Sequence, residues 1–172
     1  SIRPKAKQLT IAVPLTASRI LRLESISKLY GGGPLTAAVL VRSKEEASIF
    51  THIWRRKAWL FNHVDVTLVR VSEEAWERSS IPINALRNVA VRLAVTEFVL
   101  MLDVDMTPAT STFACFRDPA GKMLSGLLAT DESGIYTLPV FIGDLHVPPA
   151  KMKSELMNQL QNRVATTYCM NS

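Results

Sequence analysis

Several features are scarce or missing in this chain of 172 residues. Its two cysteines, Cys115 and Cys169, form no metal-ligand motif and no disulfide framework, so a disulfide-stapled or zinc-ribbon fold is excluded. No apolar run approaches the roughly 18 residues that cross a bilayer. The amino end lacks the charged, apolar and small-residue order of a secretory signal. Repeats and low-complexity segments are missing too, which excludes solenoid and fibrous architectures.

The composition is that of a globular protein. Hydrophobic residues make up 48% and charged residues 20%, enough for one domain with a sizeable core. The net charge of +5 is a mild bias, compatible with an anionic ligand. In the Trp- and Arg-rich segment 52–60, helical spacing turns Trp and Leu inward and the cations outward. We therefore expect no nucleic-acid partner.

Strand-like and helix-like segments alternate along the chain. The expected strands are 8–14, 35–41, 64–71, 98–102 and 136–142. The expected helices are 18–30, 43–59, 82–95 and 148–161. Short links between such elements indicate right-handed crossovers and a largely parallel sheet. The pattern predicts a single α/β domain over residues 1–172.

Local signals set the expected boundaries. Pro14 is expected to stop the first strand, Ser18 to cap the first helix, and Ser43 with Glu46 to form a capping box. The triple glycine 31–33 follows a helix and opens a strand, the reverse of a phosphate-binding loop, so it predicts a helix C-cap and turn. Two buried helix faces are expected: Leu23, Ile26 and Tyr30 on the first, and Ile83, Leu86, Ala90 and Leu93 on the third.

An acidic pair follows the most apolar strand. Residues 98–102 run directly into Asp103-Val104-Asp105, and in a strand residues i and i+2 share a face. Two like charges there cost free energy unless a cation or a proton lies between them. Two chemistries use such a pair: a hard divalent cation with substrate phosphates, or phosphoryl transfer to an aspartate nucleophile. Ligands of open parallel sheets bind at the carboxyl ends of strands, where Thr16 and Ser18 are also expected.

Other polar residues have simpler interpretations. Asn84, Arg87 and Asn88 form a stripe at i, i+3 and i+4, which on spacing alone indicates a solvated helix face. The three histidines are isolated, so surface or core positions are favoured over metal binding: His52, His63 and His146. His146 stays a candidate ligand because it is the one histidine downstream of the acidic pair.

Two families share motifs with the chain. "LDVDMT" matches the Asp-x-Asp-x-Thr start of haloacid-dehalogenase-type phosphatases, and "VFIGDL" imitates their later Gly-Asp element. That family places its aspartates on the opening strand, whereas three expected strands precede them here. A longer ordered set resembles the LARGE-type β-glucuronyltransferases of glycosyltransferase family 49. Its elements, from about residue 9 onward, are "SRILRLE", "GGP" before a strand, "PINALRNVA" before an acidic triplet, and "LPVFI" followed by "PPAKMKSELMNQLQ".

This resemblance implies a GT-A fold, a UDP-sugar donor, first of all UDP-glucuronate, and Mn²⁺ or Mg²⁺ as cofactor. By the same resemblance Asp103 and Asp105 hold the metal and donor, with Asp105 the more direct ligand. Arg87 supports the donor side. Thr16, Ser18 and Arg19 lie near the nucleotide. The implied acceptor is a glycan or glycoprotein, and the implied location is the Golgi lumen.

The catalytic base has no recognisable motif. Inverting glycosyl transfer needs a base on the acceptor hydroxyl, and Asp131, Glu132 and Asp144 are the acids between the Asp-x-Asp motif and the last helix. The chain begins at Ser1 without a methionine, and the family's following half is not found. We therefore expect a Rossmann-like GT-A domain that is incomplete at its carboxyl end. Two alternatives stay open: a non-catalytic nucleotide-sugar-binding relative, and an aspartyl-phosphate phosphatase.

Overall fold

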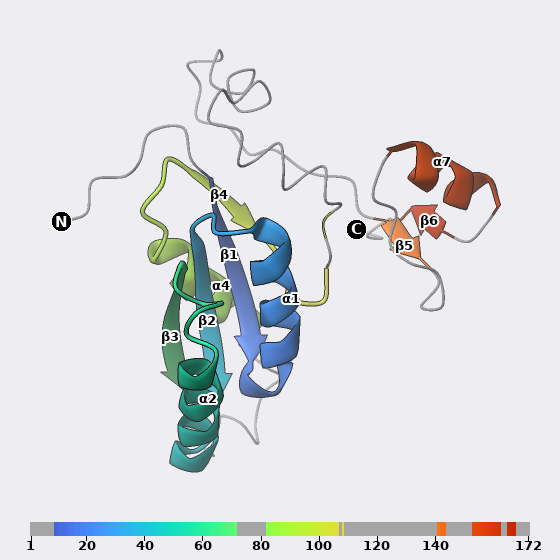
Figure 1. Cartoon of the computed structure of the whole chain (residues 1–172). Helices are drawn as coiled ribbons and strands as arrows, with labels where there is room; N and C mark the ends of the chain where they lie inside the picture. Colours follow the sequence, from blue (N-terminus) through green and yellow to red (C-terminus); the bar gives the residue numbers. More distant parts are fainter. Residues whose placement is uncertain are drawn as a thin grey trace.

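The computed structural model describes residues 9–71, 82–106, 108, 141–143, 153–162 and 165–167, and the account below concerns these residues (Figure 1). The first part of the chain contains, in order, β1 (Leu9–Thr16), a 3₁₀ turn η1 (Ala17–Arg19), α1 (Ile20–Tyr30), β2 (Leu35–Val41), α2 (Lys44–Arg56), β3 (Val64–Arg70), α4 (Ile83–Arg92) and β4 (Phe98–Met101). The later elements are β5 (Phe141–Gly143), α7 (Lys153–Gln161) and β6 (Ala165–Thr167).

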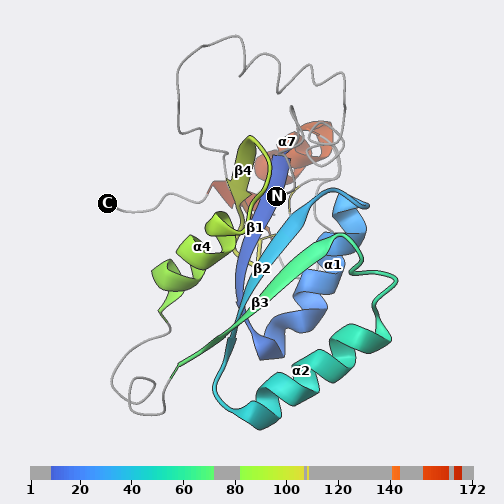
Figure 2. The same cartoon turned by 90° about the vertical axis from the view of Figure 1, so that its left-hand side faces the viewer.

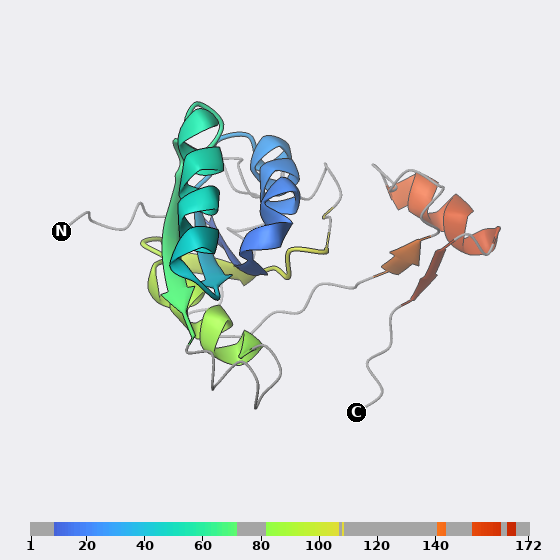
Figure 3. The same ribbon diagram turned by 90° about the horizontal axis from the view of Figure 1, so that it is seen from below.

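The main sheet is parallel throughout. Its four strands lie in the order β3-β2-β1-β4, and each neighbouring pair is parallel. Figure 2 shows α1 and α2 on one face of the sheet and α4 on the other. The view from below in Figure 3 shows the same two layers of helix around the sheet. The expected α/β class with a helix-flanked parallel sheet is confirmed, and the arrangement is consistent with a GT-A fold.

Side chains of β1 and β2 alternate between two cores. Ile11, Val13 and Leu15 pack on the α1–α2 side, with Leu23, Ile26, Tyr30 and Phe50. Ala12, Ala38 and Leu40 pack on the other side, with Leu86 and Ala90 of α4. Both central strands are buried on both faces, as expected of a parallel sheet. The small alanines let α4 approach closely, and Thr36 donates to the Ala90 carbonyl at 2.8 Å across this contact.

The buried face expected for α1 is confirmed, because Leu23, Ile26 and Tyr30 are all buried. For α4 it is partly wrong. Leu86 and Ala90 are fully buried, but Ile83 is 36% exposed. Ile83 is the first residue of α4. Helical spacing gives the direction of a side chain, whereas burial also needs a neighbouring element to cover it.

Pro14 does not stop β1, which continues to Thr16. In a parallel strand alternate residues bond to opposite neighbours. Ile11 donates to Pro34 on the β2 side at 3.1 Å, while Ala12 accepts from Leu102 on the β4 side at 2.9 Å. Pro14, two residues after Ala12, therefore turns its nitrogen toward β4. Since proline has no N–H, the β1–β4 ladder ends here while the β1–β2 ladder continues.

The expected caps are confirmed at two of three places. Ser43 caps α2 by accepting from Glu46 N at 3.1 Å, and Glu46 in turn accepts from the backbone of Arg42 at 2.6 Å. Gly31 ends α1 in the left-handed conformation, with φ of 60°, and donates to Ser27 O at 3.0 Å. Ser18 caps no helix: it lies inside η1, and α1 begins after it without a side-chain cap. The helix expected to reach Trp59 ends at Arg56.

The later elements form a small unit of their own. β5 and β6 pair antiparallel, with Phe141 opposite Thr167, and α7 contacts β6. The strand expected over 136–142 is found at Phe141–Gly143, and the helix expected over 148–161 is found at Lys153–Gln161. Their other residues lie outside the described part. Within that part, no helix combines the length and apolarity needed to span a bilayer.

Candidate functional site at the carboxyl edge of the sheet

Asp103 and Asp105 lie on a turn after β4, so the rule that residues i and i+2 of a strand share a face does not apply to them. β4 ends at Met101, and Leu102 makes the last bond to β1. The chain then leaves the sheet, because Pro14 has no N–H to offer the next carbonyl. Met106 N donates to Asp103 O at 2.9 Å and closes the turn, while Val104 is buried beneath it. The expected position at the carboxyl end of the sheet is nevertheless confirmed.

Asp103 is held by Arg87 of α4 through two contacts. Arg87 Nη2 lies 2.7 Å from Asp103 Oδ2, and Arg87 Nε lies 3.3 Å from Oδ1. Such two-point pairing fixes the planes of both groups. Asn84, one turn earlier on α4, accepts from Arg87 Nη1 at 3.1 Å and so orients the guanidinium. The two charged side chains are 34% and 33% exposed, so Asp103 is partly enclosed.

Asp105 has a looser partner from another element. Arg19, in the 3₁₀ turn after β1, forms an ion pair with Asp105 through one nitrogen. The side chains of Arg19 and Asp105 are 49% and 57% exposed. Beside them, the hydroxyls of Thr16 and Ser18 lie 2.9 Å apart. The turn after β1 and the turn after β4 are therefore joined at this edge.

The guanidinium groups of Arg19 and Arg87 offset the repulsion expected between Asp103 and Asp105. Two carboxylates so close would repel each other. Each instead faces its own arginine, and the two arginines come from different elements, η1 and α4. The solvated-face interpretation of the α4 stripe holds for Asn84 and Asn88, which are exposed. It is wrong for Arg87. The sequence placed Asn84 in the same stripe but not its hydrogen bond with Arg87, for which the i, i+3 spacing was the available signal.

The residue types at this edge fit a hard divalent cation. Mg²⁺ and Mn²⁺ take oxygen ligands, and at phosphate sites one or two carboxylates suffice, with substrate phosphates completing the coordination. Asp103 and Asp105 supply two such carboxylates. Within the described ranges, no group of three or more His, Cys, Asp or Glu side chains gathers as an all-protein cage.

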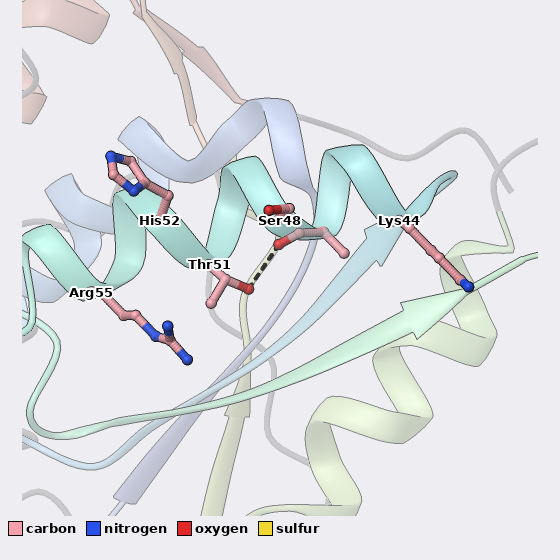
Figure 4. Close-up of a pocket in the computed structure, with 6 residues that line it drawn as sticks. Lys44, Ser48, Thr51, His52 and Arg55 are labelled. Carbon is pink, nitrogen blue, oxygen red and sulfur yellow. Dashed lines mark hydrogen bonds between the residues drawn. The ribbon is translucent and has the colours of Figure 1, made fainter.

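The other sequence candidates lie elsewhere. His63, directly before β3, contacts Ser27 and Asn62, and burial lowers the pKa of its imidazole below the ordinary value. His52 is exposed on α2. Figure 4 shows it with Lys44 and Arg55 along a cavity of about 350 Å³ on that helix. The remaining candidates lie outside the described residues: Cys115, Asp131, Glu132, Asp144, His146 and Cys169.

The fold defines a class: a parallel α/β domain, consistent with GT-A, with paired charged side chains at the carboxyl edge of its sheet. A comparison with protein families identifies the family within this class. The family described as "Glycosyl-transferase for dystroglycan" matches residues 60–171. The chain belongs to this LARGE-type family, glycosyltransferase family 49. Arg87, Asp103 and Asp105 lie within the matched range, whereas Thr16, Ser18 and Arg19 precede it.

Curated relatives agree with this assignment. The chain is 30% identical over 114 residues to "Xylosyl- and glucuronyltransferase LARGE2" of Mus musculus and of Homo sapiens, covering 66% of this chain. The protein of that name from Rattus norvegicus is 28% identical over 123 residues. The aligned part is 16% of the mouse protein and 15% of the human one, so the chain spans a small share of their length. No solved structure matches.

Proposed function

We propose that this chain forms the donor-binding part of a glycosyltransferase that takes a UDP-sugar, UDP-glucuronate first, and transfers the sugar to a glycan or glycoprotein. The observation that carries the proposal is the acidic turn. Asp103 and Asp105 stand where ligands of open parallel sheets bind, and the turn lies within the part of the chain that matches the glycosyltransferase family. By family resemblance the site of action is the Golgi lumen.

Asp103 and Asp105 have different parts in the proposal. Asp103 is held by Arg87, which Asn84 orients in turn, so the Asp103 carboxylate has a fixed orientation in the site. Asp105 is more exposed and makes one contact, so it is the carboxylate that changes partner at least cost. When a diphosphate binds, its oxygens compete with Asp105 for the guanidinium of Arg19. Asp105 is then free to bind a cation.

The cofactor of the proposal is Mn²⁺ or Mg²⁺, held by Asp103 and Asp105 together with the donor diphosphate. Such an ion supplies Lewis-acid charge stabilisation at the leaving UDP. The chain's own cations support the same purpose: Arg19 and Arg87 place positive charge beside the diphosphate. The hydroxyls of Thr16 and Ser18 offer hydrogen bonds to the nucleotide. Each of these roles is proposed from position and chemistry.

The acceptor side of the proposed site must include a catalytic base. A base must take the proton of the attacking hydroxyl, and its loss typically removes about 10²–10⁴ in rate. Among the residues that the structure describes at this edge, both carboxylates are already committed to Arg19 and Arg87. Outside them, Asp131, Glu132 and Asp144 are the first acids to replace.

A second candidate function follows if Asp103 and Asp105 both bind the cation, because neither is then available as the catalytic base. A chain that binds donor but supplies no base would be a nucleotide-sugar-binding relative that acts through partners. The two candidates are separated by assaying UDP release and product formation from UDP-glucuronate. Turnover that is lost in Asp103→Ala supports the enzyme, while donor binding without turnover supports the binding protein.

Donor binding is tested by calorimetry of UDP with the full chain, in Mn²⁺ and in EDTA. We expect binding in Mn²⁺ only, and Asp105→Asn to weaken it by roughly ten- to a hundredfold, the loss of one charged contact. Equal UDP affinity in both buffers would remove the metal from the proposal. Incubation with fluoroberyllate is expected to give no complex at Asp103, whereas a tight complex there would favour the phosphatase alternative.

A further inference from the structure

A second cavity lies at the opposite end of the sheet from Asp103 and Asp105. It is a shallow depression, open to solvent, of about 330 Å³. The loop after α1 and the loop after α2 form its walls, where β2 and β3 begin (Figure 2). A bond of 3.2 Å from Leu35 N to His63 O joins the two loops. The lining residues are Ser27, Lys28, Gly31, Gly32, Trp59, Leu60, Asn62 and His63.

Trp59 is the unusual residue of this cavity. It follows the end of α2 and is 73% exposed, more than any other large apolar side chain among the described residues. Trp54, five residues earlier, is packed instead: its ring stacks on Phe61 with centroids 4.4 Å apart and lies against the core. An indole left in water beside a cavity has a large apolar face available to a ligand.

The groups around Trp59 are polar and fixed in place. The Ser27 hydroxyl donates to Leu60 O at 3.0 Å and lies 3.1 Å from His63 Nε2, which ties α1 to the second loop. Asn62 lies at 3.0 Å from the other ring nitrogen of His63 and is itself exposed. An amide side chain has more hydrogen-bonding positions than this one contact uses. Lys28 adds an ammonium group that is 55% exposed and pairs with Glu24 Oε1 at 2.8 Å, so a ligand hydroxyl would share it with that carboxylate.

The floor of the cavity is backbone. Gly31 and Gly32 both have positive φ, of 60° and 93°, and a Cβ at Gly32 would meet nothing within 4 Å. Glycine at these positions leaves the surface beside Trp59 without side chains. Neither glycine therefore has a side chain that would obstruct a ligand in this cavity.

We propose that this cavity is a carbohydrate subsite, in which a pyranose ring stacks on Trp59 and its hydroxyls bond to Asn62 and Lys28. A pyranose has an apolar face of C–H groups and an edge of hydroxyls. It therefore matches an exposed aromatic ring bordered by amide and ammonium groups. The subsite is separate from Asp103 and Asp105, so a glycan unit bound here is held away from the donor edge. It does not rest on the proposed donor chemistry and needs no metal.

The test is a titration of the full ¹⁵N-labelled chain with xylobiose, cellobiose and methyl β-glucuronide in EDTA. The three tryptophans give separate indole N–H signals, and Trp59→Phe assigns the one of interest. We expect the Trp59 signal to shift with at least one sugar at millimolar concentration. Trp59→Ala has no indole signal, so its binding is followed through backbone amide signals. It should be weaker by about tenfold or more, as truncation of an aromatic anchor does. Asn62→Ala should weaken it less.

Matched controls separate this subsite from general effects. Leu21→Ala, another exposed apolar residue on α1, should leave the sugar affinity unchanged. Glycerol at equal concentration should not move the Trp59 signal. The proposal is overturned if no sugar shifts that signal at tens of millimolar, if glycerol shifts it equally, or if Trp59→Ala binds as the parent does. Sugar binding that appears only with UDP and Mn²⁺ would place it at the other edge and also overturn the proposal.

Discussion

The two ends of the parallel sheet are built in different ways. At the carboxyl end, charged side chains from three elements meet in ion pairs that are a third to a half exposed. At the amino end, the structure depends on glycine backbone, a buried tyrosine and a partly buried histidine. The charged groups of the first arrangement are exposed enough to exchange partners, whereas Tyr30 in the second is 1% exposed and its hydroxyl is bonded to Leu9 O. Substitutions at the amino end should therefore reduce stability, and those at the carboxyl end should mainly reduce ligand binding.

Gly33→Ala should have the largest effect on stability. A Cβ at Gly33 would meet the ring of Tyr30. That ring cannot move aside, because it is 1% exposed and its hydroxyl donates to Leu9 O at 2.6 Å. Overpacking of this kind costs about 1–3 kcal/mol. Urea unfolding followed by circular dichroism measures it.

Gly32→Ala is the matched control for Gly33→Ala. Its Cβ has open space, so the cost is confined to backbone strain at φ of 93°, about 1 kcal/mol or somewhat more. If Gly32→Ala destabilised the chain more than Gly33→Ala, the packing of Tyr30 would not be what constrains this end of the sheet.

Arg87→Met should have a smaller effect on stability. It leaves Asp103, 33% exposed, without its two-point partner. A fully buried unpaired charge costs about 3–5 kcal/mol, and exposure lowers that here to about 1–2 kcal/mol. Arg87→Lys should restore only part of the loss, because an ammonium cannot pair through two parallel bonds. Chemical unfolding of each variant provides the measurement.

Arg19→Met is the comparison for Arg87→Met. Its partner Asp105 is 57% exposed, so the loss should be below about 1 kcal/mol. A double-mutant cycle with Asp103→Asn should give coupling to Arg87 and none to Arg19. Equal coupling to both arginines would contradict the division between a fixed and an exchangeable pair.

The smallest effect concerns the pH dependence of stability. Burial lowers the pKa of His63. The unfolded chain then binds its proton more readily than the folded chain does. The contribution of His63 is therefore fully present above the unfolded pKa of about 6.5 and is lost as the pH falls below it, toward the lowered folded pKa. His63→Gln should flatten the stability profile below about pH 6.5. Unchanged slopes in His63→Gln would remove His63 as the cause.

Much of the fold was predictable because its signals are local. Hydrophobic runs and helical spacing located the four strands of the main sheet and the helices between them, and Ser43 and Gly31 marked ends through bonds to near neighbours. The extent of β1 was not predictable. Whether Pro14 ends a strand depends on which neighbour its nitrogen faces, and that is set by pairing with segments far along the chain.

The sequence identified residues of the candidate site but not which of them form ion pairs with each other. The acidic turn was found from its contrast with the apolar strand before it. Its partners were not, because Arg19 lies 86 residues from Asp105 and reaches it through the sheet order. The stripe on α4 shows the same limit. Helical spacing placed Asn84, Arg87 and Asn88 on one face of α4. Only the structure shows that Arg87 contacts Asp103, while Asn84 and Asn88 are exposed.

Electron paramagnetic resonance of Mn²⁺ tests the central claim most directly, since free Mn²⁺ gives a strong six-line signal that weakens on binding. With the full chain and UDP together, we predict a loss of free signal beyond that with UDP alone. Asp105→Asn should abolish the difference, while Asp65→Asn, an exposed aspartate on β3, should retain it. If the chain and UDP together bind no more Mn²⁺ than UDP alone, or if Asp105→Asn binds as the parent does, the acidic turn is not the cation and donor site.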